Sequence, residues 1–219
     1  GNGDGNVYAI NLEDGSKAWE FATNDRVWAT PTVVDENVYV ASLDHNFYAL
    51  NLETGDERWR FEADGSIATD PVYADGDLWF GDFTSTLYRV DPETQEVVWS
   101  YEAQDWLWAT PVLDDNVLYF ADVGGGVYAL DIESETFLWE SPDLIDDIIH
   151  GRPALSDDGS LLFVPGYEKG VVHAVDTATG TLQAGWAETL ARSARQRYLS
   201  PLKCLSDIAF TYLTLPARL

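Results

Sequence analysis

The stretch "YALNLETGDERW", residues 48–59, decides the fold because the chain repeats its pattern at a fixed interval. Its tyrosine and tryptophan ends recur every 40 residues in three further copies, at 8–19, 88–99 and 128–139. Prolines between the copies keep steps of 40, 40 and 42 residues: Pro31, Pro71, Pro111 and Pro153. A period of this length is typical of architectures in which each repeat is one supersecondary unit stacked against its neighbours.

The unit at 29–61 shows what one repeat contains. Four short runs rich in Val, Tyr, Phe and Trp, at 32–34, 37–41, 47–51 and 58–61, are separated by turn-forming Asp, Asn and Gly. The second and third runs are apolar on both faces, which favours a sheet that is covered on both sides. The pattern therefore predicts an all-β fold, a β-propeller whose blades are four-stranded antiparallel sheets.

The repeat also sets the expected domain organisation. We expect one propeller domain over 1–186, with a partial blade at 1–22 and blades at 29–61, 68–101, 109–140 and 152–186. This is an incomplete propeller of four to five blades. The tail at 187–219 departs from the repeat, and two interpretations stay open. Residues 200–212 could supply a degenerate strand pair that closes the first blade, because Pro201 stands seven residues before Ile208, as Pro31 does before Val38. Alternatively, the tail is unrelated sequence.

The first residues, "GNGDGN" at 1–6, look like a calcium loop, but no frame gives the ligand spacing of an EF-hand. They align with the turn-forming stretches at 42–46, 82–86 and 122–126, which share no set of metal ligands. We therefore expect a turn here and no metal site. The three histidines, His45, His150 and His173, are also too far apart for a ligand motif.

The composition is strongly acidic, with 38 Asp and Glu against 12 Lys and Arg and a net charge of −26. This balance argues against nucleic-acid binding, which needs a basic surface. It indicates a solvated, self-repelling surface, or alternatively an attraction for cations or a basic partner. No apolar run reaches the length of a transmembrane helix. The single cysteine, Cys204, cannot form a disulfide within the chain, and the lack of Met leads us to expect a fragment or a processed form.

The segments "AINLEDGSKAW", "ALNLETGDERW", "RVDPETQEVVW" and "ALDIESETFLW" resemble the tryptophan-docking motif Ala-x-Asp-x-x-Thr-Gly-x-x-x-Trp. With the "TPVV…VYV…VYALD" pattern, they make residues 1–186 similar to the PQQ-binding-like, or quinoprotein alcohol dehydrogenase-like, β-propeller repeat proteins. The resemblance implies an extracytoplasmic location. It also implies that four tryptophans dock between neighbouring blades: Trp19, Trp59, Trp99 and Trp139. Gln95 and Glu135 replace the glycine of the motif in two copies.

Enzymes of the resembled family hold pyrroloquinoline quinone and calcium, and the alcohol dehydrogenases add a pair of adjacent cysteines and an acidic base. This chain has no cysteine pair, and none of its acids can be matched to that base. We therefore expect no catalytic residue, no cofactor and no metal. The alternative is a fragment of a PQQ-dependent dehydrogenase, with quinone and calcium bound in the full-length protein.

The candidate binding residues lie where the chain enters the first strand of each repeat. The third residue before each proline is Trp28, Ala68, Trp108 or His150, and the residue just before it is Thr30, Asp70, Thr110 or Arg152. Core positions are uniform between copies, whereas these differ in chemistry, and every blade presents them at the same channel mouth. We expect a binding surface there: Trp28, Trp108, His150, Arg26, Asp70 and Arg152. The alternative is that Trp28 and Trp108 only plug the channel.

These observations favour a non-catalytic scaffold or recognition module that binds a protein or another ligand through its channel-mouth loops. Such a module is similar to the propeller lipoprotein of the outer-membrane β-barrel assembly machinery or to extracytoplasmic sensor propellers. A protein partner is expected, and nucleic acid is not.

Overall fold

The computed structural model describes residues 1–184, in which 18 strands form five antiparallel sheets. The first sheet has two strands, β1 (Asn6–Ile10) and β2 (Lys17–Ala22). The second contains β3 (Thr32–Val34), β4 (Asn37–Ala41), β5 (Asn46–Asn51) and β6 (Glu57–Glu62). The third contains β7 (Val72–Ala74), β8 (Asp77–Gly81), β9 (Thr86–Asp91) and β10 (Glu96–Glu102). The fourth contains β11 (Val112–Asp114), β12 (Val117–Ala121), β13 (Val127–Asp131) and β14 (Thr136–Ser141). The fifth contains β15 (Ala154–Leu155), β16 (Leu161–Pro165), β17 (Val172–Asp176) and β18 (Thr181–Leu182).

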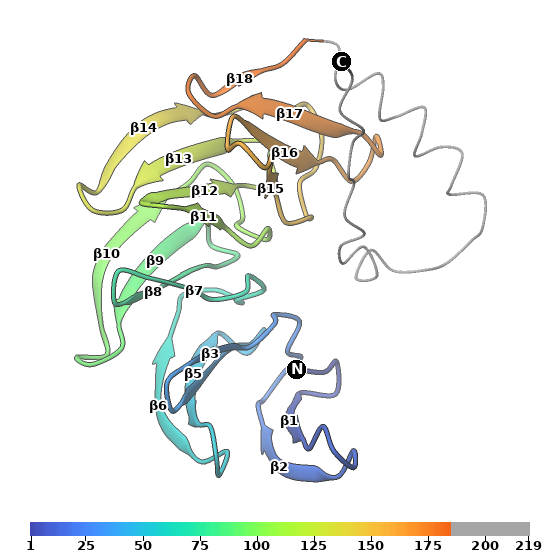
Figure 1. The fold of residues 1–219 in the computed structure, drawn as a ribbon, viewed down its shortest axis with the longest axis vertical. Helices are drawn as coiled ribbons and strands as arrows, with labels where there is room; N and C mark the ends of the chain where they lie inside the picture. The colour runs from blue at the N-terminus through green and yellow to red at the C-terminus, as the bar shows by residue number, and fades with distance from the viewer. Residues whose placement is uncertain (185–219) are drawn as a thin grey trace.

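Within each four-stranded sheet, every strand pairs with the strand that follows it in sequence. The sheets succeed one another along an arc, with the first strand of each toward the concave side and the last toward the convex side (Figure 1). No helix in the described part of the chain is long and apolar enough to cross a membrane. Trp186, the predicted tail at 187–219 and the strand pair predicted at 200–212 lie outside the described residues.

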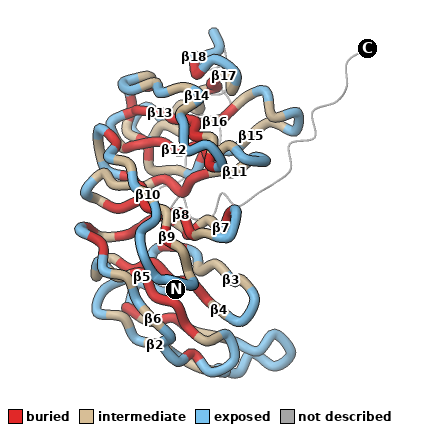
Figure 2. The backbone as a smooth tube through the Cα atoms, turned by 90° about the vertical axis from the view of Figure 1, so that its left-hand side faces the viewer, coloured by how far each residue is buried: buried red, intermediate tan, exposed pale blue. Residues whose placement is uncertain are grey.

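The core lies between neighbouring sheets, because the two middle strands of each sheet are covered on both faces. In β5, every residue from Phe47 to Leu50 is buried, and buried residues follow the middle strands throughout the arc (Figure 2). Phe47 stacks on Phe80 of the next sheet, with ring centroids 4.3 Å apart. The last strand, β6, instead alternates exposed and half-buried residues, as expected for the edge strand of a blade.

A bulge occurs at the same place in the first four sheets and accounts for one strand start that the sequence pattern misjudged. The pattern also placed the start of β5 one residue late, at 47 and not at Asn46. Ala49 pairs with Trp59, but the next residue, Leu50, pairs with Glu57, so Arg58 is an extra residue in the ladder. The pattern predicted a strand at 58–61, whereas β6 spans Glu57–Glu62. Because a bulge breaks the two-residue alternation, a simple alternating pattern cannot place this strand's start.

The tryptophans after this bulge reach toward the following sheet. The indole N–H of Trp19 donates to the Leu52 carbonyl oxygen at 2.9 Å. The same ring lies so close to Gly55 that a Cβ there would stand 2.6 Å from it. Trp139 repeats this arrangement over Gly180 and donates to the Thr177 carbonyl at 2.8 Å. The glycine of the motif thus leaves room for the indole of the preceding sheet.

Candidate functional site

One face of the arc carries all the segments that differ most between repeats. The first strand of each sheet runs away from this face and the second returns to it. The linkers between sheets therefore lie beside the turns that join the second and third strands. We call this the mouth face; it comprises the linkers 23–31, 63–71, 103–111 and 142–153 and the turns 42–45, 82–85, 122–126 and 166–171.

Backbone hydrogen bonds hold the linkers of the mouth face between neighbouring turns. The amide N–H of Ile67 donates to the Ser42 carbonyl at 3.1 Å, and that of Leu107 donates to the Asp82 carbonyl at 3.0 Å. On the other side, the N–H of Phe83 donates to the Ser66 carbonyl at 2.9 Å. Side chains on these linkers therefore project from a fixed backbone.

Six rings on the mouth face form one continuous stack, which we call the aromatic row: Trp28, Phe83, Trp106, Trp108, His150 and Tyr167. Trp108 is its centre, with ring centroids 5.5 Å from Trp28, 4.8 Å from Phe83 and 4.4 Å from His150. Trp106 stacks on Phe83 at 5.5 Å, and Tyr167 packs on His150 at 4.9 Å. The row connects residues of three linkers, 23–31, 103–111 and 142–153, with two turns, 82–85 and 166–171.

The row is half open to solvent. Trp28 is 47% exposed, Trp106 49% and Tyr167 55%, while Trp108 and His150 are partly buried between their neighbours. Trp28 reaches Trp108 although a whole repeat separates them, because the equivalent position of the intervening repeat is the short, buried Ala68. The row therefore combines a packed centre with accessible ends.

The structure brings together three of the six residues predicted for the site: Trp28, Trp108 and His150. Arg26 and Arg152 lie in the same linkers, two residues before Trp28 and two residues after His150. Both arginines are exposed. The role of these residues in binding stays a prediction.

Asp70 occupies a different environment from the other predicted site residues. Its carboxylate accepts a hydrogen bond from the Thr30 N–H at 2.6 Å, and its own N–H donates to the Thr110 hydroxyl at 2.9 Å. Asp70 thus ties three successive linkers together. Because one carboxylate oxygen of Asp70 already accepts a hydrogen bond within the chain, this residue connects neighbouring blades.

Three rings of the row, Phe83, Trp106 and Tyr167, were not predicted. Trp106 occupies the repeat position of Arg26 and Ser66, so the variation between copies could have revealed it. Phe83 likewise stands where other copies have Leu43 and Val123. Tyr167 belongs to the turn of the least regular copy, and no alignment of the repeats identifies it.

Asp147 holds Tyr167 in place. This carboxylate is only 9% exposed, and it accepts hydrogen bonds from the N–H groups of Ile148 at 2.8 Å, Glu168 at 2.9 Å and Lys169 at 3.2 Å. A buried carboxylate needs such donors to offset the loss of its hydration. The linker before His150 and the turn of Tyr167 are therefore joined by one side chain.

Burial among its neighbours lowers the pKa of the His150 imidazole. The ring is consequently neutral at neutral pH, and the stack of six rings carries no charge of its own. An uncharged aromatic surface suits contact with apolar side chains, because no ionised group has to be desolvated when it is covered.

The aromatic row has no gap between its rings for the planar quinone of the resembled enzymes. A planar ring inserted between two others needs them about 7 Å apart, twice the contact distance of carbon atoms. The rings around Trp108 are already in contact at 4.4–5.5 Å between centroids. Within residues 1–184, no group of three His, Cys, Asp or Glu side chains lies together as a metal site would require.

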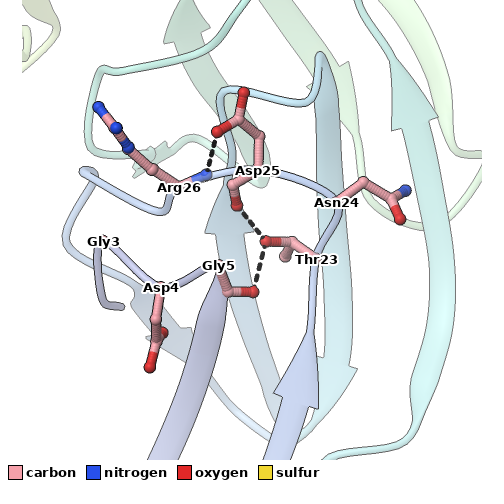
Figure 3. A pocket seen from close by; sticks show the side chains of 7 residues that line it. All are labelled: Gly3, Asp4, Gly5, Thr23, Asn24, Asp25 and Arg26. Atoms are coloured by element: carbon pink, nitrogen blue, oxygen red, sulfur yellow. Dashed lines mark hydrogen bonds between the residues drawn. The ribbon is translucent and has the colours of Figure 1, made fainter.

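A hollow of about 220 Å³ lies near the first sheet, and Figure 3 shows its seven lining residues: Gly3, Asp4, Gly5, Thr23, Asn24, Asp25 and Arg26. The Thr23 hydroxyl contacts the Gly5 and Asp25 carbonyl oxygens at 2.7 and 2.5 Å, so it is engaged within the turn. The hollow is open and lined by turn backbone, unlike the enclosed apolar clefts that bind small molecules.

Comparisons with known proteins agree with this geometry. The model of the family described as outer membrane protein assembly factor BamB matches residues 3–199. No curated protein matches the sequence significantly. The crystal structure of BamB from Moraxella catarrhalis is similar, with a TM-score of 0.70 and 18% identity, over 81% of this chain and 54% of that chain. The crystal structure of the computationally designed Ika8 protein has a TM-score of 0.68 and 15% identity, over 78% of this chain and 52% of that chain.

These two likenesses show the fold, and the chain spans about half the length of each solved structure. The predicted all-β propeller with four-stranded antiparallel blades is therefore confirmed.

Proposed function

Because this chain belongs to the family of the outer membrane protein assembly factor BamB, we propose that it is a non-catalytic propeller scaffold that binds another protein through its mouth face. The family description concerns assembly of outer membrane proteins. We extend to this chain an extracytoplasmic location and a protein partner. The alternative of a quinone-dependent dehydrogenase has no supporting geometry at the aromatic row.

The observation that carries the proposal is the aromatic row itself. Tryptophan, tyrosine and arginine are the residue types most enriched among those that dominate binding energy at protein interfaces. Here tryptophans and a tyrosine are stacked around a packed centre and flanked by Arg26 and Arg152. Trp28, Trp106 and Tyr167 are exposed, which suits contact with the surface of a macromolecule better than binding of a small molecule that must be enclosed.

Site-specific photo-crosslinking tests the proposal. Trp106 is replaced by a photoreactive benzoyl-phenylalanine, and the chain is produced in cells that encode it. Leu138 of β14 receives the same replacement as the control, because it is 55% exposed, close to the 49% of Trp106, and lies in the last strand of its sheet. We expect a discrete protein adduct from position 106 and none from position 138. Equal labelling at both positions, or none at 106, would contradict a protein partner on the mouth face.

A further inference from the structure

We infer that the partner offers an acidic peptide segment: apolar side chains that cover the aromatic row, flanked by carboxylates that pair with Arg26 and Arg152. This inference rests on the proposed function and names the chemistry of its partner. It follows from where the unpaired positive charges of residues 1–184 lie.

Basic side chains are scarce in this protein, and nearly all of those described are already paired. Five of the seven within residues 1–184 form ion pairs with carboxylates of the chain: Lys17, Arg58, Arg60, Arg89 and Lys169. Arg26 and Arg152 are the two exceptions among the residues that the structure describes, and neither guanidinium makes a hydrogen bond there. Each stands two residues from a ring of the aromatic row, Arg26 before Trp28 and Arg152 after His150.

Three acids of the mouth face bind linker or turn backbone and form no ion pair with Arg26 or Arg152. Asp25 accepts from the Arg26 N–H at 2.7 Å, and Asp105 accepts from the Trp106 N–H at 2.8 Å. Asp147 is bound to three backbone N–H groups, as described above. These carboxylates fix the backbone from which the rings project and leave the guanidinium groups of Arg26 and Arg152 available.

The free arginines and the neutral rings together select the class of ligand. Apolar side chains are required to cover the exposed parts of Trp28, Trp106 and Tyr167 with a gain in free energy. Carboxylates are the natural counterpart of a guanidinium, since its planar fork matches their geometry. Single-stranded nucleic acid also stacks on aromatic rings, but it needs a basic groove along its backbone. The two unpaired arginines of residues 1–184, on a chain of net charge −26, do not supply one.

The inference has an unusual kinetic consequence. An acidic segment is repelled at long range by a protein of net charge −26 and attracted only at short range by the two arginines. Raising NaCl from about 10 mM to about 100 mM shortens the screening length from about 30 Å to about 10 Å. The association rate should therefore increase with salt, whereas a basic partner would associate more slowly.

The first experiment selects peptides from a display library of short random sequences on the immobilised full chain. The Trp28→Ala/Trp108→Ala double variant serves for counter-selection, and circular dichroism verifies its fold. We expect enrichment of peptides that combine Trp, Phe or Leu with Asp or Glu. Enrichment of Lys and Arg instead would overturn the acidic segment while leaving a protein partner in place.

The second experiment reverses the charges. Arg26→Glu/Arg152→Glu should weaken a selected acidic peptide by about tenfold, the combined value of two exposed ion pairs, and should lower its association rate. Arg58→Glu is the matched control, because it changes the same residue type at the start of β6, on the face opposite the mouth, and should have little effect. Equal weakening by the Arg58 variant would overturn the inference.

Two further outcomes separate the inference from the proposed function. A single-stranded oligonucleotide probe that binds the wild type but not the Trp28→Ala/Trp108→Ala variant would overturn both the acidic segment and the proposed function. If no peptide is enriched over the counter-selection but the photo-crosslink at position 106 still traps a protein, the acidic segment is wrong and the scaffold function stands.

Discussion

Removing the central ring of the aromatic row is the most informative perturbation of the mouth face. Trp108→Ala deletes three stacked contacts, with Trp28, Phe83 and His150, at centroid distances of 5.5, 4.8 and 4.4 Å. Each aromatic pair contributes about 0.5–1.5 kcal/mol beyond the area that it buries, so three pairs sum to about 3 kcal/mol. Trp28→Ala deletes the contact with Trp108 alone and should cost about 1 kcal/mol.

Urea titration of both variants, followed by circular dichroism, measures these costs. The slopes of the transitions should match that of the wild type, so that the midpoints report stability. If Trp108→Ala costs no more than Trp28→Ala, the stacking at the centre of the row does not stabilise the fold and the reasoning fails. If Trp108→Ala lowers stability but leaves the photo-crosslinked partner bound, Trp108 is a plug and the binding surface lies elsewhere.

Four further results are expected. Gly125→Ala should lower the free energy of unfolding by about 2–5 kcal/mol in urea titration, because φ is +101° and a Cβ would stand 1.9 Å from the Ile145 carbonyl oxygen. Gly124→Ala is the control and should lower it far less, because the nearest atom to its Cβ would be a carboxylate oxygen of Asp105 at 3.1 Å. Burial lowers the pKa of His150 and of His173, so the unfolded chain binds more protons below about pH 6.5 and stability should fall as pH drops through that value; a flat urea midpoint between pH 7 and pH 5 would contradict this. Added NaCl should raise the urea midpoint, since a net charge of −26 repels itself in the compact state; an unchanged midpoint would indicate well-dispersed charges. Titration with pyrroloquinoline quinone and calcium should give no saturable change in tryptophan fluorescence, and tight saturable binding would restore the dehydrogenase alternative.

The repeat made the architecture predictable, but equal spacing hides how individual turns are built. The hydroxyl of Tyr48 donates to Asp44 at 2.7 Å, four residues earlier. In the next copy, Tyr88 donates to Asp82 at 3.2 Å, six residues earlier, and Thr84 stands at the position equivalent to Asp44. The same contact is thus made from two positions. When the copies are aligned at a step of 40 residues, the two aspartates fall at different positions, although they make the same hydrogen bond to the tyrosine.

A second case concerns two departures from the motif that compensate each other. Arg89 replaces the motif's alanine, and Glu135 in the following copy replaces its glycine. The Arg89 guanidinium contacts Glu135 of the next sheet at 2.8 Å and Asp77 of its own sheet at 2.6 Å. Glu135 keeps the positive φ of the glycine it replaces, at 55°. The sequence marks both positions as irregular, but only the distance between them explains why they occur together.

The sequence predicted that Trp28, Trp108 and His150 lie together, and this grouping has a physical reason; their role in binding stays a prediction. Trp28, Trp108 and His150 could be found because linkers at equal repeat positions converge on one face. Tyr167 could not, since its place depends on the lengthened turn of the fifth sheet and on the buried carboxylate of Asp147. Residue spacing predicts the position of a side chain where the repeats are regular. It does not do so where an irregular turn, such as that of Tyr167, packs onto the linkers.

The division between regular blades and variable linkers would also let an exposed aromatic surface bind selectively, as we propose for the aromatic row. A free tryptophan side chain loses rotamer entropy when a partner immobilises it, and this loss opposes binding. In the aromatic row, Trp108 is confined by three neighbours, and Trp28 and Tyr167 each lean on a ring that is itself confined. The fold has therefore ordered these rings before any partner arrives. The linkers that hold them are fixed by backbone hydrogen bonds to the turns on either side, so the stability of the blades sets the geometry of the binding surface.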